Sequence, residues 1–470
     1  MSLLSVLNSA RSSFSVTSQQ SALVARNVAN SADPTATRKF GNQSYERVGA
    51  VDIRSISQSS DPALYRSLIS AQASQGTNQT LADALDRVRD VIGDVDAPTS
   101  PSASIAALKD ALTDLAGSPE SSHLQRAAVD AARTVTTNIN NATKSVQDMR
   151  GDADRQLEAG AKRLNELLAN LETLNAKVVS GTEAGADVTD DVDQRDRIVS
   201  EISDYVGVSV RFRANNDLVL STDSGIVMFE TTPRSVEFAR TPSFDPSIRL
   251  DSAVPAKRPG EFKIDGVSIG ADSTMTVREG TLVAALKLRD EIGVQFQDRL
   301  DDTANTLINE TFAENGAPGL FERAGPATIS IAASVDYRLP TGDPARLRDG
   351  GINGSASFNA AGDAGFSDRL NQLVARFSDQ HTFATGEIGT IAMFTAGSMA
   401  RFEDIRATAS EDASYQSVMV ARTRDALSNK TGINLDDEMS HLLELERTYQ
   451  ASTKLVQTVG DLLDGLLAVR

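Results

Sequence analysis

The chain has 470 residues, of which 40% are hydrophobic, so it is long enough for roughly two to four domains with a substantial core. A net charge of −18 without any basic run argues against a general nucleic-acid surface, because phosphate contacts need clustered lysine and arginine. The absence of cysteine excludes disulfides and zinc–thiolate sites. With 5% aromatic residues and no tryptophan, the composition favours helices packed through leucine and alanine.

The first ten residues have no basic leader, and their apolar residues are periodic rather than continuous, so we expect no secretory signal peptide. No apolar run approaches the ~20 residues that are needed to span a bilayer. If the protein leaves the cell, we therefore expect a route without a cleaved signal.

Helical periodicity dominates the first 205 residues. Apolar residues three to four apart predict helices over residues 3–29, 62–92, 106–115 and 190–205. A longer series from Leu124 to Val178 predicts one very long helix or two in succession. Apolar runs beyond ~25 residues are typical of coiled coils or elongated bundles rather than compact globules.

The period becomes that of strands after Val206, and short alternating or apolar runs predict a small β domain over residues 206–275. Residues 314–366 are rich in Gly, Pro, Ala and Asp, with one strand candidate at Thr328–Ala332. Helices are predicted again over residues 280–307, 366–377, 402–427 and 435–469. This order favours an insertion into a helical rod over repeated βαβ units.

We therefore predict an elongated, mainly α protein with several domains and a β insertion. The terminal helices form a coiled-coil domain (residues 1–60 and 430–470), and a helical rod domain is made of residues 61–205, 276–313 and 367–429. Residues 206–275 form a small outer β-rich domain, and residues 314–366 are an irregular or β segment without a domain assignment.

Three patterns that could indicate chemistry are interpreted as structural. His123, His381 and His441 match no metal-ligand spacing and are expected on the surface or at helix flanks. Residues 222–225 resemble a serine-nucleophile turn but lack its preceding glycine and a partner histidine, which favours a β-turn. The acid-dense residues 189–196 lack the glycine of a calcium loop and are interpreted as a charged helix start. We predict no catalytic residue, no cofactor and no metal.

Both ends of the chain carry an apolar stripe with coiled-coil spacing. A single stripe cannot bury itself, so each terminal helix needs a partner, either the other end of the chain or neighbouring copies. Thr17 and Ser21 occupy the intervening positions of the N-terminal stripe. Ala10 and Ser452 are small residues within the two stripes. We predict an assembly and chaperone interface at Leu3, Leu7, Phe14, Val24, Val28, Leu442, Leu445, Tyr449, Val456, Val459, Leu463 and Leu466.

Short segments next to these stripes resemble bacterial flagellar axial proteins. Residues 27–34 read Asn-Val-Ala-Asn-Ser-Ala-Asp-Pro, similar to the Asn-x-Ala-Asn…Pro signature that ends the first helix of that group, and Thr37-Arg38 follow. Residues 449–454 match its Tyr-Gln-Ala-Ser/Asn-x-Lys signature, and residues 432–439 resemble the start of its last helix. Asn434 is a suitable N-cap there, and three acids follow it. Thr35-Ala36 and Glu446-Arg447 depart from the usual Gly-Tyr and Gln-Gln.

Two segments in the middle narrow the resemblance to the flagellar hook-associated protein 1 family. Residues 193–203, which begin Asp-Gln-Arg-Asp and lead into Val206-Gly207-Val208, are similar to that family's corresponding segment. Residues 280–282 and 288–291 resemble its return helix. The resemblance covers both ends and the helical middle.

The resemblance implies a structural subunit of the extracellular hook–filament junction, exported unfolded by the flagellar type III system and needed for filament assembly. It further implies terminal helices that are disordered in the monomer and ordered on assembly. The expected partners are copies of the chain, the hook protein, a second hook-associated junction protein and an export chaperone, with no nucleic acid and no membrane. The alternatives are a flagellin or a hook- or rod-type subunit, or an adhesin or enzyme carried on the outer region.

Overall fold

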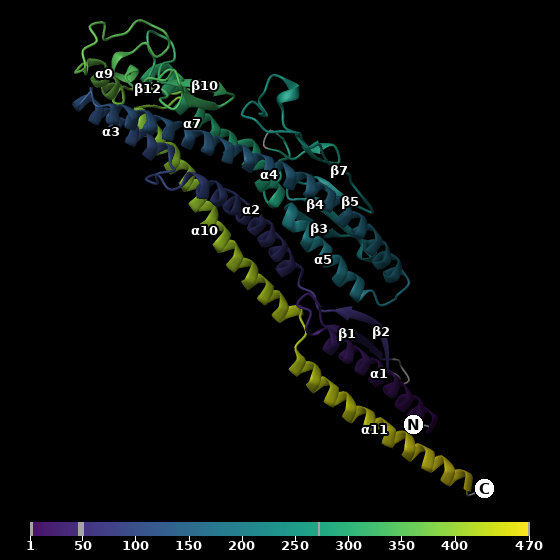
Figure 1. Cartoon of the computed structure of the whole chain (residues 1–470). Helices are drawn as coiled ribbons and strands as arrows, with labels where there is room; N and C mark the ends of the chain where they lie inside the picture. Colours follow the sequence, from purple (N-terminus) through teal and green to yellow (C-terminus); the bar gives the residue numbers. More distant parts are fainter. Residues whose placement is uncertain (1–2, 46–50, 271–272, 469–470) are drawn as a thin grey trace.

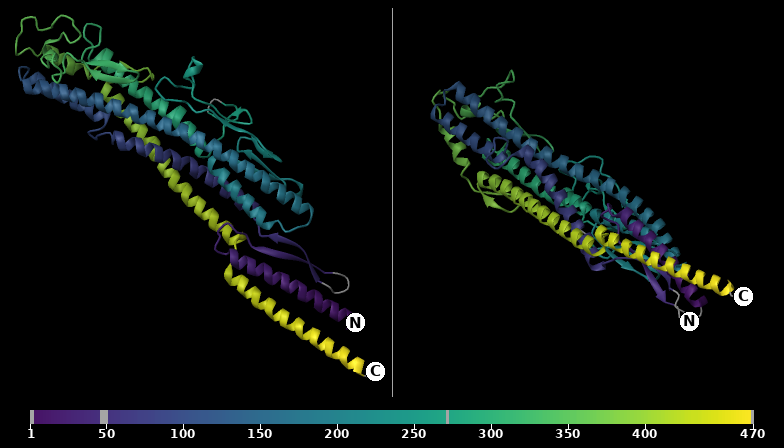
Figure 2. Two further views of the ribbon diagram at one scale, coloured as in Figure 1. Left: turned by 45° about the vertical axis from the view of Figure 1, so that its right-hand side comes forward. Right: turned by 90° about the horizontal axis from the view of Figure 1, so that it is seen from below.

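The protein is an elongated helical rod that continues at one end into a pair of terminal helices (Figure 1). This computed structural model describes residues 3–45, 51–270 and 273–468. The N- and C-terminal helices lie side by side, and both chain ends are found at the same tip in all three views (Figures 1 and 2). The predicted elongated, mainly α fold with a β insertion is confirmed.

One helix, α4 (Ser122–Glu183), forms the spine of the rod. Its 62 residues carry a continuous buried stripe that includes Leu157, Leu164 and Leu171, so the long periodic series forms one helix rather than two. Ser121 caps its start by accepting a hydrogen bond from the backbone of Leu124. Around it pack α2 (Pro62–Ile92), α3 (Pro101–Gly117) and α5 (Thr189–Tyr205), and α10 (Ile391–Thr431) packs against α2.

Local capping chemistry sets where several helices begin. Asp61 caps α2 through the backbone N–H groups of Ala63 and Leu64. α3 starts at Pro101, five residues before its predicted start, because Ser100 caps it and proline suits the first helical position. α10 likewise starts before the predicted Phe402, since Thr390 accepts from the backbone of Met393.

The return helix is less regular than its apolar spacing indicates. α6 (Thr281–Lys287) and α7 (Gly293–Thr306) are joined by a π-helical turn over Leu288–Ile292, and a second π-helical turn over Leu307–Thr311 ends the run. Arg289 in the first turn is buried and pairs with Asp154 of α4 at 2.8 Å. The bulge therefore presents a charged side chain to the spine where a regular helix would continue its apolar face.

The β insertion consists of two small antiparallel sheets beside the C-terminal half of α4. One has the order β3 (Val208–Phe212), β4 (Leu218–Thr222), β5 (Val227–Glu230) and β6 (Thr232–Pro233). The other has the order β7 (Val236–Phe238), β8 (Phe262–Ile264) and β9 (Val267–Ser268). Residues 222–225 form the predicted turn between β4 and β5. The sheets share one hydrophobic core with α2, α4 and α5.

The segment over residues 314–366 packs onto the far end of the rod. It contains the hairpin β10 (Phe321–Gly325) and β11 (Thr328–Ile331), which matches the strand candidate, and the short helix α8 (Arg346–Asp349). A second core joins them to α3, the first turns of α4, and α9 (Asp368–Arg376). The strands β12 (His381–Thr382) and β13 (Ile388–Gly389) lead into α10.

The terminal part consists of α1 (Leu3–Asn30), α11 (Leu435–Ala468) and a hairpin of β1 (Lys39–Tyr45) and β2 (Val51–Gln58). α1 lies between the hairpin and α11, so one of its faces contacts strands and another contacts the C-terminal helix. The alternation of the sequence over residues 47–57 predicts an extended segment. Residues 51–57 lie in β2, and residues 47–50 lie outside the described residues.

Gly280 should be far less tolerant of a side chain than Gly266, which also has a positive φ. Its φ is +116°, and an added Cβ would lie 2.3 Å from the Tyr205 carbonyl oxygen. We expect Gly280→Ala to lower the free energy of unfolding by about 3 kcal/mol, because strain and a backbone clash add. Gly266→Ala, at φ +77° with open space around it, is the control and should cost about 1 kcal/mol. Urea denaturation followed by circular dichroism measures both, and equal losses would contradict the argument.

Candidate functional site

The terminal stripes meet along α1 and α11, which run antiparallel. Ala10, Val24, Leu445 and Val459 are buried there, and Ser13 and Ser452 join the helices by a hydroxyl–hydroxyl hydrogen bond of 3.1 Å. Leu7, Val28 and Leu442 are partly buried, whereas Phe14, Tyr449 and Val456 remain exposed at 39%, 42% and 38%. The side chains of Leu3, Leu463 and Leu466 lie outside the described part. The role of all the predicted stripe residues as an assembly interface stays a prediction.

A buried polar cluster lies where this helix pair joins the rod. Asn27 of α1 is 2% exposed, and its side-chain oxygen accepts from the Lys39 backbone N–H at 3.0 Å. Its amide nitrogen donates to the Lys39 carbonyl at 2.9 Å and to the Glu438 carboxylate of α11 at 3.0 Å. The other oxygen of Glu438 accepts from Arg38 at 2.6 Å. One asparagine thereby ties the end of α1, the start of β1 and the start of α11 together.

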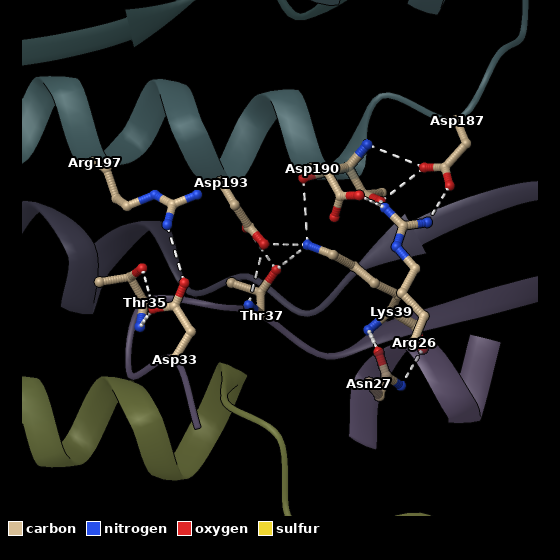
Figure 3. Close-up of polar contacts among 11 residues, drawn as sticks. Arg26, Asn27, Asp33, Thr35, Thr37, Lys39, Asp187, Asp190, Asp193 and Arg197 are labelled. Carbon is tan, nitrogen blue, oxygen red and sulfur yellow. Dashed lines mark hydrogen bonds and ion pairs between the residues drawn. The ribbon is translucent and has the colours of Figure 1, made fainter. Parts of the chain in front are cut away.

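Lys39 connects this cluster to the rod (Figure 3). Its side chain is 1% exposed, and its ammonium forms an ion pair with Asp193 of α5 and donates to Thr37 at 2.8 Å. The Asp193 carboxylate also accepts from the Thr37 hydroxyl at 2.7 Å and from the Thr37 backbone N–H at 3.2 Å. Because both charges are out of water, each depends on the other and on Thr37 for compensation.

Three less buried ion pairs flank the Lys39–Asp193 pair, two formed by Arg26 on one side and one formed by Arg197 on the other (Figure 3). Arg26 of α1 bonds to Asp187 at 2.6 Å and pairs with Asp190. Arg197 bonds to Asp33 at 3.0 Å, and both side chains are more than one third exposed. Hydrogen bonds from Thr35, together with the Arg197 charge, hold the pKa of Asp33 below its ordinary value. Pairs of this exposed kind contribute little to stability and mainly add directionality.

The Asp-Gln-Arg-Asp segment of α5 contacts three parts of the molecule. Asp193 binds the terminal cluster, and buried Arg195 donates to the Asn216 carbonyl of the β insertion at 2.6 Å. The Asp196 carbonyl accepts from the Tyr65 hydroxyl of α2 at 2.9 Å. Burial raises the pKa of the Asp196 carboxyl to about 6, and the neighbouring Asp193 adds to this while Arg195 and Lys39 oppose it. The segment is therefore a structural connector.

Sequence reasoning located these motifs but missed that they meet. The predicted charged helix start is confirmed, since α5 begins at Thr189 with acids in its first turn. Asn434 caps α11 as predicted, and Asp436 and Asp437 are exposed. Glu438, the third acid of that first turn, is buried because it faces α1, where it accepts a hydrogen bond from Asn27. No pattern in the sequence indicates that Lys39 is buried.

The expectation for the histidines is wrong at one position. His381 lies buried in β12, where its Nδ1 faces the Glu310 carboxylate. Among the described residues, no group of three or more acidic, histidine or cysteine side chains is arranged to hold a metal ion. Across the described helices, none combines the length and the apolar character that a membrane crossing requires.

Comparisons with known proteins agree with the motifs. Residues 85–314 match the family described as "Flagellar hook-associated protein FlgK helical domain", and residues 427–469 match "Flagellar basal body rod FlgEFG protein C-terminal". The chain is 21% identical to flagellar hook-associated protein 1 of Escherichia coli K12 (70% of this chain, 74% of the relative). It is 18% identical to that of Bacillus subtilis (84% and 81%) and 20% identical to that of Salmonella typhimurium (89% and 90%).

One similar solved structure is the flagellar hook junction protein FlgK from Burkholderia pseudomallei. The two share 19% sequence identity at a TM-score of 0.44, over 55% of this chain and 46% of that one.

The buried pair should matter much more than the exposed pairs beside it. We expect Lys39→Met to lower the free energy of unfolding by about 3–5 kcal/mol, because Asp193 is left buried without its cation. Arg197→Ala is the control and should cost less than about 1 kcal/mol. The double variant Lys39→Met with Asp193→Asn should recover part of the loss. Urea denaturation measures all three, and equal effects of the two single variants would contradict the assignment.

Asp196 should make stability fall as pH rises. The pKa of its carboxyl is about 6 in the folded chain, against an ordinary value of 3.8 that applies to the unfolded chain. Ionisation therefore costs the folded state more than the unfolded one. The penalty is absent below about pH 4, grows between about pH 4 and pH 6, and is complete above. We expect Asp196→Asn to raise the melting temperature by a few degrees near neutral pH and to leave it unchanged in acid. An equal gain at both pH values would contradict this.

Proposed function

The chain belongs to the flagellar hook-associated protein 1 family of structural flagellar subunits, and we propose that it joins the hook to the filament through its paired terminal helices. One observation carries the proposal. Besides the seam that faces α1, α11 exposes further large apolar side chains: Leu435, Met439, Leu443, Leu455, Val456 and Leu462. Such a surface is typical of a helix that packs against further helices.

The expected neighbours are other copies of this chain, the hook protein and a second hook-associated junction protein. Contacts of one patch with a different patch on the next subunit build rings or helical lattices, which suits a tubular axial structure. We assign the apolar members of the α1 and α11 stripes to these contacts. Before export, an export chaperone would cover the same α11 surface by a helix-in-groove contact.

We further propose that the protein acts outside the cell at the junction, after export by the flagellar type III route without a cleaved signal. The excess of acidic residues suits a subunit that must not assemble early, because like charges keep unassembled subunits apart.

A bulk flagellin or a hook- or rod-type subunit is not favoured. The C-terminal match to rod proteins by itself would fit those classes, but the helical-domain match over residues 85–314 belongs to the hook-associated family.

We also assign no catalytic role. Asp187, Asp190 and Asp193 are engaged in ion pairs, and two hollows among the described residues measure about 220 and 140 Å³. Ligand sites usually exceed these volumes.

Deletion of the gene tests the proposal when it is followed by complementation with the full chain or with a chain lacking residues 430–470. We expect hooks without filaments and unpolymerised flagellin in the medium, rescued only by the full chain. Normal filaments in the deletion strain would overturn the proposal.

Point variants then separate the outer face of α11 from its seam. Leu455→Asp changes an exposed side chain, so we expect unchanged melting of the purified chain but loss of motility, because the charge would be buried between subunits. Val459→Asp, on the buried seam, should block assembly and also loosen the helix pair while the rod stays folded. Gln457→Asp on an exposed polar position is the matched control and should swim normally. Full motility of both Leu455→Asp and Val459→Asp would contradict the interface.

A further inference from the structure

The terminal helix pair is held differently along its length. Near the rod, Val24 and Asn27 of α1 and Glu438 and Leu445 of α11 are all buried, with exposures of 5% or less. Toward the tip, Ala10 and Val459 are buried, at 5% exposure each, and the rings of Phe14 and Tyr449 lie with their centroids 4.7 Å apart. Both of those rings are about 40% exposed, at 39% and 42%. Buried apolar side chains therefore line both halves, whereas Glu438, the buried charge among the described residues of the pair, lies next to the rod.

The same half is also tied to the rod by polar contacts from several directions. The Arg38 backbone N–H donates to the carbonyl of Thr431, the last residue of α10, at 2.8 Å. The Ser59 hydroxyl donates to the Lys430 carbonyl at 3.1 Å. Together with the Lys39–Asp193 pair, these bonds hold two chain segments against the rod: the segment that follows α1 and the segment that precedes α11.

We propose that Glu438, Asn27, Arg38 and Lys39 form a polar latch that keeps the rod-proximal half of the helix pair docked in the free chain, while the tip half opens. The proximal half comprises residues 20–39 and 434–446, and the tip half comprises residues 6–17 and 449–462. This inference concerns the isolated chain and does not depend on the junction role.

Shared donors give the latch its cooperativity. The Asn27 amide nitrogen bonds to Glu438 and to the Lys39 carbonyl at once, so α11 contacts α1 through the same group that holds β1. If Glu438 leaves, one bond of buried Asn27 is lost, and Arg38 loses its carboxylate partner. Buried polar groups that lose a partner are costly, so segments that are 400 residues apart in the chain loosen together. The tip half has no comparable buried charge among its described side chains.

Hydrogen exchange of the full chain measured by mass spectrometry tests this proposal. In the wild type we expect residues 20–39 and 434–446 to be protected and the tip half to exchange rapidly. In Glu438→Ala we expect exchange in residues 20–39 to rise at least about tenfold, although the substitution lies at the other end of the chain. Asp437→Ala is the matched control, because it removes an exposed acid from the same helical turn and should leave residues 20–39 unchanged.

Each outcome decides the matter. Coupled loosening in Glu438→Ala alone supports the latch. Unchanged protection of residues 20–39 in that variant overturns it, as does a wild type that exchanges rapidly in both halves, because the latch would then be open in the free chain. Equal protection of both halves in the wild type would show that the tip does not open and would also overturn the proposal.

A thiol probe gives an independent measurement, because the chain has no cysteine of its own. Val24→Cys and Ala10→Cys place single thiols on the same buried face of α1, in the proximal and tip halves. We expect a maleimide reagent to label Ala10→Cys quickly and Val24→Cys slowly, and Glu438→Ala to accelerate labelling of Val24→Cys. Equal labelling rates at the two positions in the wild-type background would contradict a latch confined to one half.

Discussion

The continuous apolar stripe of α4 is the constraint on which the rest of the rod depends. A helix of 62 residues cannot bury such a stripe alone, so other elements must cover it along its whole length. Near its start α3, α9 and the β10–β11 hairpin do this, and further along α2, α5, α6, α7 and the β insertion take over. The result is two hydrophobic cores in line, which explains why the molecule is long rather than globular.

Charged side chains mark the places where elements distant in sequence join this spine. Arg289 pairs with Asp154 where the return helix bulges, and Lys39 pairs with Asp193 where the terminal helices meet the rod. Buried ion pairs of this kind add little net stability compared with apolar packing, but they penalise every arrangement that leaves one charge alone. They therefore favour the arrangement in which these particular segments meet.

The terminal helices combine two requirements that conflict in a single helix. They need enough contact with each other to align, and enough exposed apolar surface to engage neighbours. The seam buries Val24, Leu445 and Val459 beside the smaller Ala10 and Ser452, while Leu443 and Leu455 stay exposed on the outside. Exposed large apolar side chains are typical of a surface that is covered on assembly.

The sequence by itself determined most of the helices, the start of α11 at its Asn434 cap and the position of the β insertion, because period and capping are local properties of the chain. It also supplied the motifs that carry the family resemblance. Only the tertiary structure decided that Asn27, Lys39, Asp193 and Glu438 converge, since periodicity describes a face of one element but not the element it meets. The same limit hid the burial of Glu438, which has the sequence context of an exposed helix-start acid and becomes buried only because α1 packs against it.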